Sequence, residues 1–321
     1  MTVRRLAAIA AFIALLPAAS AAQDWPARPI RAIIPFGAGS ATDLVPRIVF
    51  DQLSPQLGQP IVVENRTGAG GTLGTNAVAK ADPDGYTLLA HSNAFSVSPA
   101  IYANLPYDTE KDFAPVAPFG SLPAVLVISP AKGFKTIQEM VAAAKAKPGT
   151  FNFASVGVGS GTHLSAEKLK LAAGFEATHV PFRGGPEALT EVITGRVEFY
   201  FCPINTALPY IREGKVVALV TNGATRAPEL PDVPTTLEAG YRNAEFPIWI
   251  GMLAPAGTPA AIVEKLNAET VKAVKNPDTQ QRLTKAGIVP LNWTPAEFAA
   301  RIKAEIVDNI AVAKAAGIKP N

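Results

Sequence analysis

The sequence has few of the side chains on which most enzyme and metal sites depend. Its only cysteine, Cys202, has no partner for an internal disulfide and lies in an apolar stretch, which is typical of a small buried residue. The three histidines, His91, His163 and His179, are far apart and show no metal-ligand spacing. The G-x-S-x-G nucleophile motif is absent. We therefore expect no catalytic residue, no metal and no cofactor.

The chain also lacks a strong excess of either charge. Its 29 basic and 26 acidic residues give a net charge of +3, which falls to +1 if an amino-terminal leader takes Arg4 and Arg5 with it. Proteins that bind nucleic acids carry a marked basic excess. Nucleic acid is therefore excluded as a partner.

The amino terminus is typical of a secretory signal peptide. Two arginines precede an unbroken apolar run from Leu6 to Leu16, which is too short to span a bilayer comfortably, and an A-x-A cleavage pattern follows. We predict a signal peptide over residues 1–22, cleaved after Ala21 or Ala22; the alternative is an uncleaved anchor. No later segment is apolar for long enough to cross a membrane.

After this leader, apolar strand patterns alternate with helical ones. Helical spacing is found over residues 43–57, 137–146, 164–172 and 186–194. Such alternation predicts an α/β fold with a mainly parallel sheet. The expected strands cover residues 30–36, 61–64, 87–90, 124–128, 151–155, 177–182, 197–201 and 216–221.

Three loops of small residues follow expected strands, over residues 37–42, 67–72 and 155–162. Their glycines let backbone N–H groups approach a ligand, and the first loop opens a helix whose positive end attracts an anion. The first loop has no lysine and no complete G-x-G-x-x-G spacing, so it favours a small carboxylate over a nucleotide. The alternative is an ordinary strand-to-helix turn built with glycines.

Several side chains near these loops permit two interpretations. Asp43 either faces the ligand or belongs to the capping of the helix that starts beside it. Arg183 either pairs with a carboxylate or is solvated, and His163 either enters the site or makes a structural hydrogen bond. Hydroxyl groups that can orient a ligand without adding charge are supplied by Ser92, Ser155, Ser160 and Thr162.

Six segments in this order resemble one family, the Bug-type, TctC-like receptors of tripartite tricarboxylate transporters. No single motif is decisive, but the ordered set is specific and covers essentially the whole mature chain. The segments are PFGAGSATD (35–43), VENRTGAGG (63–71), DPDGYTL (82–88), GSGTHL (159–164), VPFRGG (180–185) and PDVPT (231–235).

The resemblance implies a type II periplasmic binding protein fold, in which two α/β lobes with mainly parallel sheets enclose a central cleft. Lobe 1 would comprise residues 23–122 and 224–321, and lobe 2 residues 123–223. The chain would cross between the lobes near residues 121–123 and 222–224, where small or turn-forming residues interrupt the strands.

The resemblance also implies a function. A monomeric periplasmic receptor would close its lobes on a small organic acid and deliver it to the inner-membrane permease subunits of a tripartite tricarboxylate transporter. Alternatives are a receptor that reports to a membrane sensor and an enzyme acting on carboxylates. The ligand-binding residues implied are Phe36, Gly37, Ala38, Gly39, Ser40, Asp43, Ser92, Asn93, Ser155, Gly157, Ser160, Gly161, Thr162, His163, Arg183 and Gly184.

Two positions depart from the family pattern. Gly39-Ser40 stands where paired glycines are usual, which places a hydroxyl near the anion loop. Thr67 stands where proline is usual, and we expect this change to affect only a turn.

Overall fold

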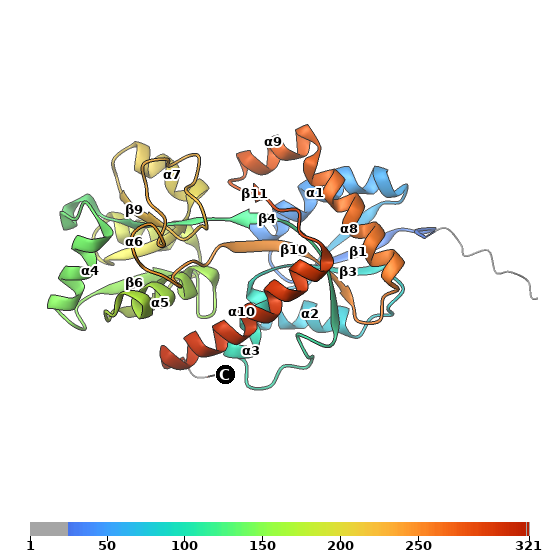
Figure 1. Ribbon diagram of the computed structural model, residues 1–321, viewed down its shortest axis with the longest axis horizontal. Coiled ribbons are helices and arrows are strands. Elements are labelled where there is room, and N and C mark those ends of the chain that lie inside the picture. The colour runs from blue at the N-terminus through green and yellow to red at the C-terminus, as the bar shows by residue number, and fades with distance from the viewer. Residues whose placement is uncertain (1–24, 319, 321) are drawn as a thin grey trace, which may run out of the picture.

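The computed structural model describes residues 25–318 and 320, so the predicted signal peptide lies outside the described residues. Two lobes, each built on one β-sheet with helices on both faces, lie side by side (Figure 1). Within the described part of the chain, no helix is both long and apolar enough to span a membrane.

Lobe 1 contains a six-stranded sheet with the order β11-β4-β10-β3-β1-β2. Alternation along β1 (Ile30–Ile34) sends Ile30 and Ile34 to one face, against α1 and α8, and Ile33 to the other, against α3 and α10. The other strands are β2 (Ile61–Asn65), β3 (Thr87–Ser92), β4 (Phe113–Leu122), β10 (Ile248–Pro255) and β11 (Val289–Pro290). The helices are α1 (Ala41–Leu57), the short η1 (Ala69–Gly71), α2 (Thr72–Ala79), α3 (Ala94–Ile101), α8 (Ala260–Lys275), α9 (Pro277–Lys285) and α10 (Pro295–Ala315).

Lobe 2 contains a five-stranded sheet with the order β7-β6-β8-β5-β9. Phe199 and Phe201 of β8 pack on one face of this sheet, whereas Tyr200 and the buried Cys202 pack on the other. The strands are β5 (Ala124–Ile128), β6 (Asn152–Ser155), β7 (Thr178–Pro181), β8 (Phe199–Pro203) and β9 (Val217–Thr221). The helices are the short η2 (Pro130–Lys132), α4 (Ile137–Ala146), α5 (Gly161–Ala173), α6 (Gly185–Ile193) and α7 (Ile204–Arg212).

The predicted two-lobed α/β fold is confirmed, but both sheets are mixed instead of mainly parallel. Four of the described strand pairings are parallel and five are antiparallel. The difference arises because the strands next to the lobe crossings run against their neighbours: β10 is antiparallel to β3 and β4, and β5 is antiparallel to β8 and β9. The prediction rested on the strands that are followed by helices, and among these β1 is parallel to β2 and β3, and β6 is parallel to β7 and β8.

The parallel strands place two loops at equivalent positions. In lobe 1, β1 lies between β2 and β3, both parallel to it; in lobe 2, β6 lies between β7 and β8 in the same way. A crevice forms at the carboxyl end of such a central strand, because the chain leaves it in opposite directions on its two sides. The loops that follow β1 and β6 therefore start at the crevice of each lobe.

The chain crosses between the lobes at two places that lie close together. The first is Pro123, between β4 and β5 (Figure 1). Residues 222–247 then pack mainly on lobe 2, since Leu230 and Ala244 belong to its two hydrophobic clusters. We therefore propose that the second crossing lies at residues 246–248, and that residues 224–247 belong to lobe 2 instead of lobe 1.

Asn222 joins the two crossing segments. It is fully buried, and its Oδ1 accepts a hydrogen bond from the backbone N–H of Ala124 at 2.7 Å. Its Nδ2 donates to the carbonyl of Phe246 at 2.8 Å and to Ser165 Oγ at 2.9 Å. One amide thus fixes the first crossing, the second crossing and helix α5 relative to one another.

Helix α10 spans both lobes, as Figure 1 shows for the red helix. Near its start, the buried Phe298 packs edge-on against Trp249 with ring centroids 4.9 Å apart. The buried Glu305 accepts hydrogen bonds from Trp249 Nε1 and Ser96 Oγ, each at 2.8 Å. Farther along, Asp308 forms an ion pair with Lys168 of α5. The helix is therefore anchored in lobe 1 and linked by charge to lobe 2.

Replacement of Asn222 by alanine tests the junction. Asn222→Ala leaves buried groups of Ala124 and Phe246 without a partner, and each such group costs about 1–3 kcal/mol. We expect a clear fall in the free energy of unfolding measured with urea. Asn104→Ala, at an exposed turn, is the control and should change it by less than about 0.5 kcal/mol. Equal effects of the two substitutions would contradict this role of Asn222.

Candidate functional site

A cavity of about 170 Å³ lies between the lobes and is lined by both. Lobe 1 contributes the loop after β1, η1 and helix α3; lobe 2 contributes the loop after β6. The lining residues are Phe36, Gly70, Ala94, Val97, Ser98, Ile101, Tyr102, Val156, Val158, Gly159 and Ser160. Because closure of the lobes would change this cavity, we take it as the candidate site.

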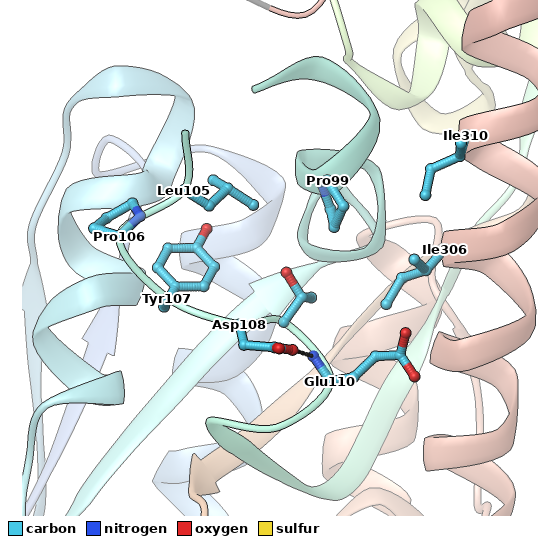
Figure 2. A pocket seen from close by; sticks show the side chains of 9 residues that line it. Pro99, Leu105, Pro106, Tyr107, Asp108, Glu110, Ile306 and Ile310 are labelled. Carbon is cyan, nitrogen blue, oxygen red and sulfur yellow. Dashed lines mark hydrogen bonds between the residues drawn. The ribbon is translucent and has the colours of Figure 1, made fainter. Parts of the chain in front are cut away.

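A larger cavity, of about 590 Å³, is lined by residues of lobe 1 (Figure 2). It is bounded by Pro99 of α3, the loop at residues 105–110, and Ile306 and Ile310 of α10. Asp108 and Glu110 place two carboxylates at its edge, which would repel an anion. Lobe 2 contributes no residue to its described lining, so we do not assign the site here.

Asp43 holds the first loop in place. One carboxylate oxygen accepts the backbone N–H of Gly39 at 2.9 Å, and the other accepts Arg47 Nε at 2.9 Å and Asn65 Nδ2 at 2.8 Å. Burial raises the pKa of Asp43, but the bonds from Asn65, Gly39 and Arg47 outweigh burial and leave the pKa below its usual range. Both oxygens are occupied by protein donors, so the structure favours positioning of the loop over ligand contact.

The start of helix α1 is left open to a ligand. Ser40 occupies the N-cap position, but its side chain makes no capping hydrogen bond, and its buried Oγ has no partner among the described residues. A Cβ added to Gly37 or Gly39 would meet no heavy atom within 4 Å. An uncapped helix N-terminus beside open space attracts a negative charge. Residues 36–40 therefore form the best-placed anion subsite.

The loop at η1 closes the cavity on another side. Gly70 and Gly71 have φ of +64° and +98°, a region that favours glycine. A Cβ on Gly70 would lie 2.0 Å from the hydroxyl of Tyr102, and one on Gly71 would lie 3.5 Å from the ring of Phe36. The glycines thus let η1 pack against the first loop and bring Tyr102 to the cavity.

Ser92 and Asn93 lie beneath the cleft. Both are buried, and the backbone N–H of Asn93 donates to the carbonyl of Trp249 at 3.1 Å. Asn93 Oδ1 would lie 3.7 Å from a Cβ on Gly161, so Asn93 reaches the start of α5 in lobe 2. Asn93 Nδ2 is buried and has no hydrogen-bond partner among the described residues. Asn93 therefore supports the interlobe contact, and neither Ser92 nor Asn93 is in the lining of the cavity.

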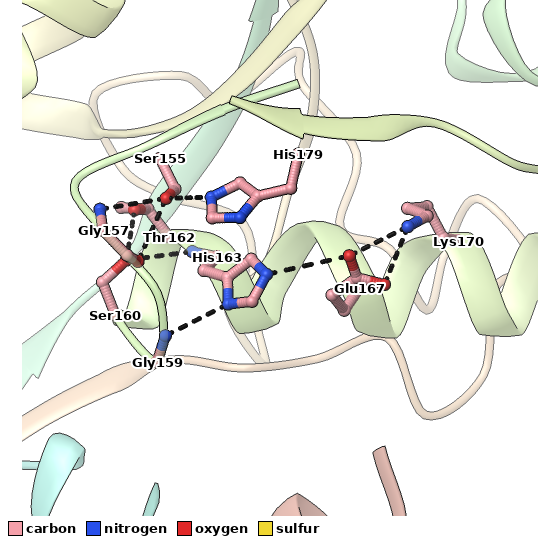
Figure 3. Close-up of polar contacts among 9 residues, drawn as sticks. All are labelled: Ser155, Gly157, Gly159, Ser160, Thr162, His163, Glu167, Lys170 and His179. Atoms are coloured by element: carbon pink, nitrogen blue, oxygen red, sulfur yellow. Dashed lines mark hydrogen bonds and ion pairs between the residues drawn. The ribbon is translucent and has the colours of Figure 1, made fainter. Parts of the chain in front are cut away.

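Hydroxyl groups fix the second loop, as Figure 3 shows. Ser155 Oγ accepts the N–H of Gly157 at 3.0 Å, and Ser160 Oγ donates to the Gly157 carbonyl at 2.7 Å. Thr162 Oγ1 accepts the N–H of Val156 at 3.1 Å. Ser160 also caps α5, because its Oγ accepts the N–H of His163 at 3.2 Å. These predicted residues come together, but their hydroxyls serve the loop itself.

His163 and His179 lie stacked behind this loop, with ring centroids 3.9 Å apart (Figure 3). His163 Nδ1 accepts the N–H of Gly159 at 3.1 Å, and His179 Nε2 lies 2.6 Å from Ser155 Oγ. Burial, and then His179 and Lys170, lower the pKa of His163 to about 3; burial and Lys170 lower that of His179 to about 4. His163 thus makes the structural hydrogen bond, one of the two interpretations left open by the sequence.

Glu167 lies one turn after His163 on helix α5. Its carboxylate is 3.8 Å from His163 Nε2, and both of its oxygens accept hydrogen bonds from Lys170 Nζ at 2.8 Å. Burial raises the pKa of Glu167, although Lys170 opposes that shift. Because Nδ1 of His163 is an acceptor, the proton of the neutral ring lies on Nε2, which faces Glu167.

Arg183 and Gly184 lie outside the lining of the cavity. Arg183 is exposed, and its backbone N–H donates to Glu187 at 3.3 Å. Gly184 precedes helix α6, whose start has no side-chain cap. The structure brings neither residue to the cavity in this arrangement of the lobes.

Sequence reasoning missed most of the apolar lining. Among the predicted residues, Phe36 and Ser160 line the cavity, and Gly37, Ala38 and Gly39 lie in the adjoining loop. The missed face of α3 consists of Ala94, Val97, Ser98 and Ile101, which have the i, i+3, i+4, i+7 spacing of one helix face. Because this spacing begins directly after the predicted residues Ser92 and Asn93, it could have indicated that the same face of the helix lines the site.

The described residues contain no group of three or more His, Cys, Asp or Glu side chains that could hold a metal ion. The acidic and histidine side chains near the cleft are instead hydrogen-bonded within the protein, as described for Asp43, His163 and Glu167.

Comparison with known proteins gives consistent matches. Residues 45–318 match the family described as the tripartite tricarboxylate transporter family receptor, TctC. A protein encoded in the tcbD–tcbE intergenic region of Pseudomonas sp. (strain P51) is 38% identical over 282 residues, which cover 88% of this chain and 84% of that protein. The protein BugT of Bordetella pertussis is 34% identical, with 98% of each chain covered.

Solved structures match in fold as well as sequence. MatC from Rhodopseudomonas palustris, solved with bound malate, has 35% identity and a TM-score of 0.75, covering 89% of this chain and 99% of that one. Rpa4515 from R. palustris, solved with adipate, has 30% identity and a TM-score of 0.79, covering 93% and 100% of the two chains.

Replacement of Asp43 by asparagine tests its role in the first loop. Asp43→Asn removes charged hydrogen bonds, so we expect the free energy of unfolding at pH 7 to fall by about 1–3 kcal/mol. Because the folded-state pKa lies below the unfolded value of about 3.9, the ionised carboxylate stabilises the fold above that pH, and this contribution is lost as the pH falls through the folded-state pKa. The difference between wild type and variant should therefore shrink below pH 4 in urea unfolding.

Asp51→Asn is the matched control, since Asp51 lies on the same helix in an exposed ion pair with Arg282. It should cost less than about 1 kcal/mol. A similar cost for both variants at pH 7 would contradict the anchoring role of Asp43.

The buried histidines can be tested by titration. His91, His163 and His179 have pKa values lowered by burial to about 4, 3 and 4, so none should titrate between pH 5.5 and 8 when its ring protons are followed by NMR. The unfolded chain binds protons near pH 6.5, whereas the folded one does not, so stability should decline as the pH falls from 6.5 toward 4. A midpoint near 6.5 for His163 would show that it is exposed and not bonded to Gly159.

Proposed function

Since the chain belongs to the tripartite tricarboxylate transporter receptor family, we propose that it is a periplasmic receptor that captures a small organic carboxylate between its lobes. The predicted resemblance to Bug-type receptors is confirmed. The observation that carries the proposal is the cavity lined by both lobes beside the uncapped start of α1.

The ligand carboxylate would bind at residues 36–40. The first N–H groups of a helix lack intrahelical acceptors. In α1 the N–H of Asp43 already donates to the Ser40 carbonyl, but Ser40 does not cap the N–H groups of Ala41 and Thr42, so a carboxylate can accept their hydrogen bonds. Ser40 Oγ is the one side-chain donor at this position that has no partner among the described residues. We propose that it donates to the same carboxylate, as the substitution of serine for the usual glycine suggests.

Lobe closure would then retain the ligand. The loop at residues 155–160 belongs to lobe 2, and a Cβ on Gly159 would lie only 3.0 Å from Ile101 of lobe 1. A ligand that contacts both loops binds the closed form better than the open form, and it shifts the equilibrium by that difference in affinity. The relatives solved with malate and with adipate support an organic acid as ligand.

We further propose delivery of the acid to the permease subunits of a tripartite tricarboxylate transporter by a monomeric receptor. Signalling to a membrane sensor is the alternative. Deletion of the gene distinguishes the two: loss of uptake supports delivery, and loss of induction with intact uptake supports sensing. An enzymatic role would require a bound acid to be recovered chemically changed.

Filling the cavity tests the binding site. Ala94 lines the cavity, so Ala94→Leu should weaken the binding of any acid found in a thermal-shift screen at least tenfold, as measured by calorimetry. A ligand at 100 times its Kd stabilises the wild type by about 2.7 kcal/mol, which makes the screen sensitive. Ala300→Leu, on the exposed face of α10, is the control. Unchanged affinity in Ala94→Leu would place the site elsewhere.

A further inference from the structure

The cavity between the lobes has no charged side chain in its lining. Six of its residues are apolar or aromatic, and the rest are glycines, an alanine and two serines. The apolar or aromatic ones are Phe36, Val97, Ile101, Tyr102, Val156 and Val158. A ligand group that reaches beyond the anion loop therefore meets hydrocarbon from both lobes, together with the one hydroxyl of Tyr102 beside Gly70.

The two serines of the lining are already engaged. Ser98 Oγ donates to the carbonyl of Ala94 at 2.9 Å. Ser160 Oγ donates to the carbonyl of Gly157 and accepts the N–H of His163. Each hydroxyl proton is thus committed within the protein, so neither serine can donate to a ligand without losing a bond.

Basic side chains beside the two loops are also engaged, and the exposed Arg183 lies outside the lining of the cavity. Arg47 donates to Asp43 and Asn65, each at 2.9 Å, and Arg66 pairs with Glu64 at 3.1 Å. Lys170 is bonded to Glu167 behind the second loop. A second carboxylate on the ligand would therefore lose water without gaining a cation, which is unfavourable.

Two valines at the mouth of the cavity are exposed to solvent, Val156 by 38% and Val158 by 52%. The loop that carries them is fixed by the bonds of Ser155, Ser160 and His163, so they are held in place before a ligand arrives. Covering such exposed hydrocarbon is favourable because it removes apolar surface from water. The apolar part of a ligand would cover it when the lobes close.

We propose that the ligand is a monocarboxylate with a compact apolar body, and that di- and tricarboxylates bind less tightly. The carboxylate lies at residues 36–40, and the apolar body lies between α3 and the two valines. This inference rests on the proposed function as a carboxylate receptor, and it distinguishes the chain from its relatives solved with malate and adipate, which are dicarboxylates.

Calorimetry with matched acids tests the inference on the mature protein at pH 7.5. Hexanoate and adipate have the same carbon chain, as benzoate and terephthalate have the same ring, and each pair differs by one carboxylate. We expect the monocarboxylate of at least one pair to bind at least tenfold more tightly than its partner. Equal or tighter binding of the dicarboxylates overturns the inference but leaves the carboxylate receptor intact. Failure of all four acids to bind ligand-free protein overturns both.

A charge placed at the mouth gives a second test. Val158→Lys introduces a cation at an exposed position, so we expect the affinity ratio of dicarboxylate to monocarboxylate to rise at least tenfold. Val307→Lys, at a position of α10 that is 64% exposed, adds the same charge far from the cavity and should leave the ratio unchanged. An unchanged ratio in both variants would mean that the apolar body does not lie beside Val158, and the inference fails.

Discussion

The arrangement of the lobes depends on the buried amide of Asn222. Its hydrogen bonds reach Ala124 at the first crossing, Phe246 at the second and Ser165 of α5. Because these bonds are directional and closed to water, the two crossing segments cannot slide past each other without leaving buried groups unpaired. Because the two loops of the candidate site belong to different lobes, this junction helps to set their separation.

Both loops are rigid for reasons that lie outside the cavity. Asp43 holds the first through Gly39 and Asn65, and stacked neutral histidines hold the second through Gly159 and Ser155. The polar side chains of Asp43, Asn65, His163 and His179 thus serve the shape of the loops, whereas the proposed ligand contacts come from backbone, hydrocarbon and the hydroxyl of Ser40. Preorganised loops of this kind lower the conformational entropy lost on binding.

Much of the fold could be predicted from the sequence because it depends on local signals. The apolar run at residues 30–36 predicted β1, and the helical pattern over residues 137–146 predicted α4, where Thr136 Oγ1 accepts the N–H of Glu139. The position that we propose for the second crossing differs from the one expected from the sequence, because it rests on long-range packing such as that of Leu230 in lobe 2, which local sequence patterns do not report. The role of His163 depends on the backbone of Gly159, and periodicity does not report that contact.

Helix α10 makes its contact with lobe 2 sensitive to the medium. Any opening that separates lobe 2 from this helix must break the ion pair between Lys168 and Asp308. Lys168 is buried, but the side chain of Asp308 is 48% exposed, so dissolved ions reach one half of the pair. Salt weakens such a pair and solvates its separated charges. The contact between α10 and lobe 2 therefore weakens as the ionic strength of the medium rises.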